Sequence, residues 1–395
     1  MTAKNQIPRL LFSLLVMLAS CSPVEETAPP SPLPSMVVSE STELSQPPAP
    51  APDSKTTPTP TILTPSATPT PTILPTSTLT PTPTEISFDI GQELTIAYLR
   101  ELEITGSEIT FEQKLANRSN YYQHLVSYLS EGNRIYGLLT IPFGDPPEGG
   151  FKAIVFNHGY IPPAAYITTE RYTAYVDYLA RNGFVVFKID LRGHGESQGE
   201  PGGSYFSPGY TIDAISALKS LQTLDFVDPQ GIGMWGHSMA GNLVLRAMLI
   251  ESDVKAGVIW AGAVYSYDDL MTLGIDDDTY QPPATPTPEV SVSPTPPTGR
   301  EAIFDTYGRP DLQVDYWRAV ALTSNIAFLN QPIQLHHALD DTVVNIAYSY
   351  GLAAVLQENG KPYAFFEYEG GGHNLISPYF EQAMQRTVDF FRENL

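Results

Sequence analysis

The 395-residue sequence contains little cysteine and few basic residues. Its single cysteine excludes an internal disulfide and a cysteine-rich metal site. It has 21 lysine and arginine residues against 43 aspartate and glutamate residues, which gives a formal net charge of −22 at pH 7. Because binding to a phosphate backbone requires a basic surface, this charge argues against a nucleic-acid partner.

The apolar run near the N-terminus is too short to span a bilayer. Residues 10–19 follow Lys4 and Arg9, and a transmembrane helix needs about 20 apolar residues. A short basic region before an apolar run of this length is typical of a secretory signal. We therefore expect an extracytoplasmic protein.

The lone cysteine closes this signal, in the sequence LASC at 18–21. These residues resemble a bacterial lipobox, in which the cysteine becomes the lipidated first residue of the mature chain. We therefore expect a lipoprotein signal peptide over residues 1–20 and a membrane-anchoring lipid on Cys21, with more than one acyl chain for stable attachment. The alternative is an ordinary signal peptide cut near Ala19.

Proline is abundant but unevenly distributed. Residues 22–84 hold 17 of the 37 prolines and 15 threonines. Such low-complexity sequence cannot bury a core, so we expect a disordered tether over residues 21–85. A second Pro/Thr patch at 281–298 interrupts otherwise globular sequence, and it predicts a disordered surface loop over residues 276–300.

From residue 121 onward, short apolar segments alternate with amphipathic ones. AIVFN at 153–157 and FVVFKI at 184–189 read as buried strands, and residues 211–224 read as a helix. This alternation predicts an α/β fold over residues 121–395, with a mostly parallel central sheet and helices on both faces. Residues 86–120 are expected to form a small β-rich lead-in.

A strand predicted over 232–235 runs into GHSMAG at 236–241, where a helix begins at once. A serine on such a tight strand-to-helix turn is a nucleophile elbow. The strained turn exposes the hydroxyl above the sheet, and the helix N-terminus offers N–H groups to an oxyanion. Ala240 replaces the last glycine of the usual G-x-S-x-G pattern. We therefore predict Ser238 as the nucleophile.

An acid and a histidine should follow this serine in the chain. A strand predicted over 333–337 is followed by Asp340 and Asp341, and either carboxylate can orient an imidazole. The last predicted strand leads into a glycine-rich loop that carries His373, the predicted general base. No histidine pair has convincing metal-ligand spacing with a third ligand, so we expect no metal and no cofactor.

The oxyanion hole needs a second backbone N–H, from the loop that follows the strand at 153–157. Gly159 in that loop allows close approach of the backbone. The N–H groups of Tyr160 and Met239 are therefore the predicted oxyanion donors.

Four segments resemble the α/β-hydrolase superfamily, most closely the prolyl-oligopeptidase-type catalytic domain and its dienelactone-hydrolase-like relatives. In that family the acid loop reads H-G-x-x-D-x-x-V, so placing His337 first implies Asp341 as the catalytic acid and keeps Asp340 in reserve. Ala338 replaces the family glycine, and Ser349 falls where the family often has a serine. The segments are NHGY at 157–160, DLRGHGES at 190–197, the run at 227–241 that ends in GHSMAG, and HALDDTVV at 337–344.

The resemblance covers about residues 120–395 and implies an α/β-hydrolase fold. It also implies a lid between the sixth strand and the acid-bearing strand, at about 262–330. Family peptidases often carry a β-propeller, for which residues 86–120 are too few. The sequence shows no clear acidic pair to capture a free amine, so dipeptidyl-peptidase action is not supported.

The sequence therefore predicts a serine hydrolase that cleaves ester or amide bonds of a small substrate through an acyl-enzyme. Ser238, Asp341 and His373 form the predicted triad, in a prolyl-oligopeptidase-like peptidase. A carboxylesterase of the same fold is the first alternative. A non-catalytic surface binding module is the second, and the presence of all three triad residues argues against it.

Overall fold

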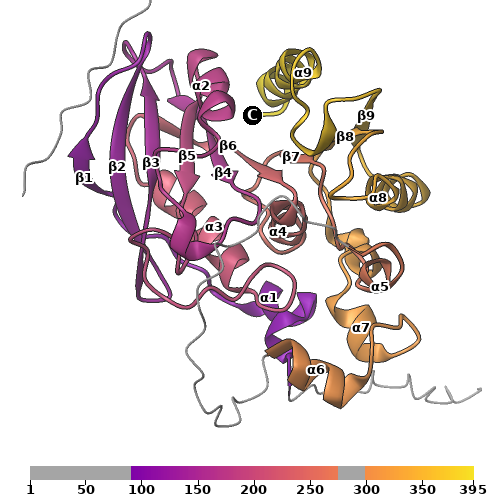
Figure 1. Cartoon of the computed structure of the whole chain (residues 1–395). Coiled ribbons are helices and arrows are strands. Elements are labelled where there is room, and N and C mark those ends of the chain that lie inside the picture. The colour runs from indigo at the N-terminus through magenta and orange to yellow at the C-terminus, as the bar shows by residue number, and fades with distance from the viewer. Residues whose placement is uncertain (1–89, 275–298) are drawn as a thin grey trace, which may run out of the picture. The chain divides into compact units, whose positions relative to one another are not determined.

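The computed structural model describes residues 90–274 and 299–395. In these ranges one sheet has the strand order β1-β2-β3-β5-β4-β6-β7-β8-β9 (Figure 1). The pairs from β1 to β5 in this order are antiparallel, and all later pairs are parallel. The strands are β1 (Thr110–Lys114), β2 (Tyr121–Ser130), β3 (Asn133–Pro142), β4 (Phe151–Asn157), β5 (Val185–Ile189), β6 (Val227–His237), β7 (Gly257–Trp260), β8 (Ile333–Ala338) and β9 (Tyr363–Tyr368).

Helices cover both faces of the sheet because its central strands are apolar on both sides. In β4, Val155 faces one hydrophobic core and Phe156 faces the other. Side chains of α3 and α4 belong to the first core, and those of α2 and α9 to the second (Figure 1). The predicted mostly parallel sheet between two helical layers is thereby confirmed. The helices are α1 (Ile96–Glu101), α2 (Thr173–Arg181), α3 (Gly209–Leu221), α4 (Met239–Ile250), α5 (Asp268–Leu273), α6 (Gly299–Tyr307), α7 (Asp315–Val320), α8 (Ala347–Glu358) and α9 (Tyr379–Asn394).

The predicted catalytic residues all follow the carboxyl ends of parallel strands. Tyr160 lies after β4, Ser238 after β6, Asp341 after β8 and His373 after β9. The carboxyl ends of parallel strands lie at one edge of a sheet, where open α/β sheets bind their ligands. The topology therefore gathers residues that are far apart in the sequence.

The residues before β2 differ from the expected β-rich lead-in. Residues 90–120, the part that the structure describes, contain the helix α1 as well as the strand β1. The helix forms because the Thr95 hydroxyl accepts a hydrogen bond from the Tyr98 N–H, and because Ile96 and Leu99 are buried. Tertiary burial of this apolar face decides the local structure.

The segment expected to form a lid is helical where the structure describes it. It contains α5, α6, α7 and a 3₁₀ segment at Thr323–Phe328. The predicted loop at 276–300 lies outside the described residues, apart from its last two residues, which open α6. The predicted signal peptide, Cys21 and the tether over 21–85 also lie outside them. No helix in the described ranges is long and apolar enough to cross a membrane.

Candidate active site

Ser238 occupies a strained turn between β6 and α4. Its φ and ψ angles are 56° and −121°, a conformation that non-glycine residues rarely adopt. Its N–H donates to the Trp260 carbonyl at 2.9 Å, and its own carbonyl accepts from the Gly241 N–H at 2.8 Å. A Cβ on Gly236 would lie 2.6 Å from the Ala240 carbonyl oxygen, so the turn requires a small residue there. This is the geometry of a nucleophile elbow.

His373 lies against Asp341. The Nδ1–H of His373 donates to Oδ2 of Asp341 at 2.8 Å. The other oxygen, Oδ1, accepts from the N–H groups of Val343 at 2.9 Å and Val344 at 3.0 Å. Burial by itself raises the pKa of Asp341, but hydrogen bonds from His337 and His373 outweigh it and hold that pKa well below its usual range. A permanently ionised carboxylate thus faces Nδ1 and leaves Nε2 of His373 for chemistry.

The neighbouring Asp340 makes a different contact. Its Oδ1 accepts a hydrogen bond from the backbone N–H of Gly372 at 2.8 Å. Asp340 therefore braces the loop that carries His373, whereas Asp341 binds the imidazole. The structure brings Asp341 and not Asp340 to the ring.

The side chain of His337 holds Asp341 in place. Its Nε2 lies 2.9 Å from the Val344 carbonyl and 3.1 Å from Oδ2 of Asp341, and both are acceptors. Nε2 must therefore carry the proton, and in the neutral ring Nδ1 accepts from the hydroxyl of Ser349 at 2.8 Å. His337 and Ser349 are both buried, so the side chains that hold Asp341 in place have little freedom to move.

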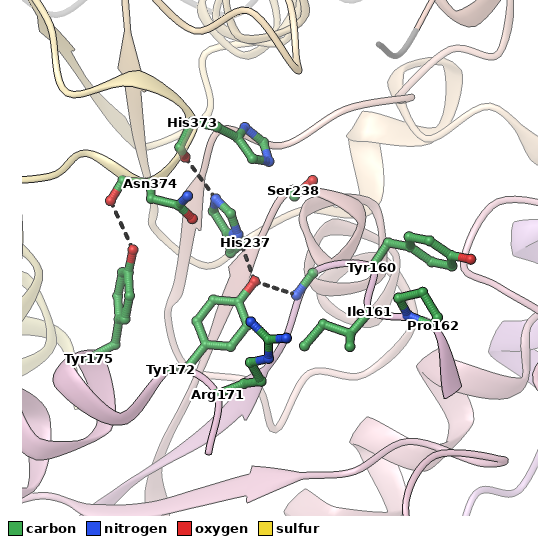
Figure 2. Close-up of a pocket in the computed structure, with 11 residues that line it drawn as sticks. Tyr160, Ile161, Pro162, Arg171, Tyr172, Tyr175, His237, Ser238, His373 and Asn374 are labelled. Carbon is green, nitrogen blue, oxygen red and sulfur yellow. Dashed lines mark hydrogen bonds between the residues drawn. The ribbon is translucent and has the colours of Figure 1, made fainter. Parts of the chain in front are cut away.

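Ser238 and His373 line the same cavity, whose volume is about 320 Å³. Figure 2 shows the imidazole of His373 on the same side of this pocket as Ser238. The opposite wall comes from the loop after β4 and from the start of α2. The other lining residues are Gly159, Tyr160, Ile161, Pro162, Arg171, Tyr172, Tyr175, His237 and Asn374.

The loop after β4 approaches the serine very closely. A Cβ on Gly159 would lie 3.1 Å from Cβ of Ser238 and 2.8 Å from the hydroxyl oxygen of Tyr172. Within the described residues, the N–H of the next residue, Tyr160, has no hydrogen-bond acceptor. Met239 opens α4, and N–H groups in a first helical turn have no partner within the helix. Both predicted oxyanion donors thus flank Ser238.

A chain of hydrogen bonds joins that loop to the backbone of His373 (Figure 2). The N–H of Gly159 donates to the Tyr172 hydroxyl at 2.9 Å, which lies 2.8 Å from Nδ1 of His237. Nε2 of His237 lies 2.8 Å from the His373 carbonyl, which only accepts, so Nε2 holds the proton and Tyr172 donates to Nδ1. Burial and the nearby His373 lower the pKa of His237 to about 3, so the ring of His237 is neutral.

His158, in the loop after β4, is not among the residues that line the pocket. It is fully buried, and its Nδ1 lies 2.7 Å from the Gly159 carbonyl. Burial and the nearby His194 lower its pKa to about 3. In residues 90–274 and 299–395, no three His, Cys, Asp or Glu side chains form a group that could hold a metal ion.

Sequence reasoning missed the contributions of residues 171–175 to the pocket. The hydroxyl of Tyr175 donates to the Asn374 carbonyl at 2.8 Å, directly after His373. Arg171 and Tyr172 line the same cavity. No local motif marks these residues, because their roles depend on how α2 packs against β3, β5 and α9.

Comparison with protein families matches residues 151–283 to a family described as serine aminopeptidase, S33. Human dipeptidyl peptidase 8 is 26% identical over 279 residues, which is 67% of this chain and 27% of that protein. An uncharacterised 31.7 kDa protein of Escherichia coli is 29% identical over 130 residues, which is 32% of this chain and 43% of that protein. The chain thus spans less than half the length of these curated relatives.

Solved structures share the fold at low sequence identity. Acetyl xylan esterase 1 from Thermoanaerobacterium sp. JW/SL YS485 aligns with a TM-score of 0.55 at 16% identity, covering 76% of this chain and 93% of that one. A puromycin-hydrolysing peptidase of Mycobacterium tuberculosis aligns with a TM-score of 0.54 at 19% identity, covering 70% of this chain and 40% of that one.

The sheet order and the strand-to-helix turn at Ser238 define an α/β-hydrolase fold. The family match over residues 151–283 agrees with this fold. The solved structures that share this fold include an esterase and a peptidase.

Proposed function

We propose that Ser238, His373 and Asp341 form a catalytic triad that hydrolyses an acyl bond through a covalent acyl-enzyme. The observation that carries this proposal is the pairing of His373 with Asp341 at 2.8 Å, in the same cavity as the strained Ser238. The pairing reserves Nε2 of His373 for the serine hydroxyl, and the strain exposes that hydroxyl.

The reaction proceeds in two halves. Nε2 of His373 takes the proton of Ser238 as Oγ attacks the carbonyl carbon, and the N–H groups of Tyr160 and Met239 stabilise the oxyanion. The imidazolium then gives its proton to the leaving oxygen or nitrogen, and the acyl group stays on Oγ. A water molecule, deprotonated by His373, attacks the acyl-enzyme and releases the acid and the free serine.

As substrate we propose a small carboxylic ester. The pocket volume of about 320 Å³ lies at the low end for ligand sites. Among the described residues that line the pocket none is acidic, so none of them would hold the free amine of an aminopeptidase or dipeptidyl-peptidase substrate. A prolyl-oligopeptidase-like endopeptidase is the second candidate, supported by the match to a peptidase family and to dipeptidyl peptidase 8.

A fluorophosphonate probe tests the nucleophile. We expect the full chain to label and the Ser238→Ala variant not to label. Absence of labelling in the folded wild type, or equal labelling of Ser238→Ala, overturns the triad. Rates on p-nitrophenyl esters and on proline-containing peptide amides then separate the two substrates. Cleavage of the amides at rates comparable to the esters would favour the peptidase.

We further propose that the enzyme is held at a membrane by lipid on Cys21 and acts outside the cytoplasm. The lipobox-like sequence at 18–21 and the Pro/Thr-rich residues that follow it support this localisation.

A further inference from the structure

We propose that Arg171 makes the pocket selective for substrates that carry a carboxylate close to the scissile bond. The inference rests on the proposed hydrolysis at Ser238 and extends it to a substrate class. Its basis is one cation in the wall of the cavity that holds Ser238, and this cation has no partner among the described residues.

The pocket is electrostatically asymmetric. Among the described residues that line the pocket, Arg171 is the one with a permanent charge, and none is aspartate or glutamate. The chain as a whole has 43 acidic residues against 21 basic ones. A cavity wall with a cation and no acid is therefore unlike the average surface of this protein, and it favours an anion inside the cavity.

The guanidinium of Arg171 is also available for binding. Other arginines are engaged: Arg192 forms ion pairs with Asp213 at 2.7 Å and with Glu131 at 2.9 Å. In contrast, within residues 90–274 and 299–395 the guanidinium of Arg171 makes no ion pair, hydrogen bond or aromatic contact. Its planar fork of N–H groups matches the two oxygens of a carboxylate.

The backbone around Arg171 is held in place, so its side chain is presented from a fixed point. The carbonyl of Arg171 accepts a hydrogen bond from Nζ of the buried Lys188 at 2.8 Å. The hydroxyl of the next residue, Tyr172, is hydrogen-bonded to the N–H of Gly159 and to Nδ1 of His237. Figure 2 shows the guanidinium of Arg171 beside Tyr172 at the wall of the pocket.

The test compares matched neutral and anionic esters within each variant. p-Nitrophenyl butyrate and mono-p-nitrophenyl glutarate place the charge on the acyl side. In the second pair, phenyl acetate and 3-acetoxybenzoate, the anionic ester carries its carboxylate on the leaving group. The measured quantity is the ratio of kcat/KM for the anionic ester to kcat/KM for the neutral ester, so a general loss of activity cancels.

We expect Arg171→Glu to lower this ratio about tenfold or more in at least one pair, and Arg171→Gln to lower it less. The affected pair identifies the side that carries the carboxylate. Arg309→Glu is the matched control, because it makes the same charge change at an exposed arginine outside the pocket. Equal ratios in Arg171→Glu and Arg309→Glu for both pairs overturn the inference.

Labelling by the fluorophosphonate provides a second measurement that needs no turnover. Glutarate should slow labelling of Ser238 in the wild type and in Arg309→Glu, but not in Arg171→Glu, and butanamide should slow none of them. If glutarate does not change the rate of labelling in the wild type, the carboxylate site is contradicted. The proposed hydrolysis at Ser238 is not affected by that result. If the wild type neither reacts with the fluorophosphonate nor hydrolyses any of the esters, the proposed function itself is contradicted.

Discussion

The side chain of His237 donates a hydrogen bond from Nε2 to the backbone carbonyl of His373 at 2.8 Å. The residue before the proposed nucleophile thus holds the backbone of the proposed general base. Its other nitrogen accepts from Tyr172, whose oxygen also accepts the N–H of Gly159. One neutral imidazole therefore ties together the serine turn, the oxyanion loop and the histidine loop.

Replacing His237 with alanine should reduce kcat about tenfold and change KM little, because the His373 loop loses one anchoring hydrogen bond. His237→Gln is the conservative comparison, since its side-chain amide retains a donor, and it should recover part of the loss. Steady-state kinetics on a neutral ester check this. A change confined to KM would contradict the positioning role.

Adjacent aspartates provide a matched pair for the acid. Asp341→Asn should reduce kcat by about four orders of magnitude, because an amide stabilises the wrong imidazole tautomer and no imidazolium. Asp340→Asn should have a small effect, since its amide oxygen still accepts the Gly372 N–H. Comparable losses in both variants would show that the acid has been assigned to the wrong residue.

Gly159→Ala should lower kcat on a small ester about a hundredfold. Its Cβ would lie 2.8 Å from the Tyr172 hydroxyl oxygen and 3.1 Å from Cβ of Ser238, so the oxyanion loop must move. Gly351→Ala in α8 is the control, because a Cβ there meets no atom within 4 Å. The control should keep full activity and raise the free energy of unfolding by about 0.5–1 kcal/mol. Full activity of Gly159→Ala would argue against the proposed oxyanion loop.

Buried histidines should make the fold sensitive to acid. Burial, the first cause in each case, lowers the pKa of His158 and of His237 to about 3, whereas an unfolded histidine titrates near pH 6.5. Below pH 6.5 the unfolded chain therefore takes up protons that the folded chain excludes, and stability falls until about pH 3.

Each of these histidines contributes a slope of about 1.4 kcal/mol per pH unit in that window. Denaturant unfolding of His158→Gln between pH 6.5 and 4 should show a free energy of unfolding that depends less steeply on pH than in the wild type. The difference in slope should correspond to one proton. A slope that does not change would mean that His158 is protonated in the folded protein.

Cys21→Ser should abolish incorporation of radioactive palmitate and release the enzyme from membranes into the soluble fraction. Esterase activity per molecule should not change, because the replaced residue lies far from the catalytic domain in the sequence. Palmitate labelling that persists in Cys21→Ser would sink the lipoprotein hypothesis.

The sequence by itself determined the sheet and the order of its chemical groups. Apolar runs such as 153–157 can only be buried on both faces, so the alternation with helices predicts a mostly parallel sheet. The serine in GHSMAG and the later acid and histidine are recognisable because a nucleophile elbow demands small residues at fixed spacing. The lead-in was less readable, since its helix depends on burial of Ile96 and Leu99 against distant elements.

The family resemblance implied Asp341 as the acid, but only the tertiary structure shows which group each aspartate meets, because both follow the same strand. The tertiary structure also shows the hydrogen bond from His237 to the His373 carbonyl, and it places Arg171 in the pocket wall. These relationships join residues that are far apart in the chain, and no local pattern encodes them. Residue types and spacing therefore predicted the chemistry, and tertiary contacts between distant segments decided which side chains surround the site.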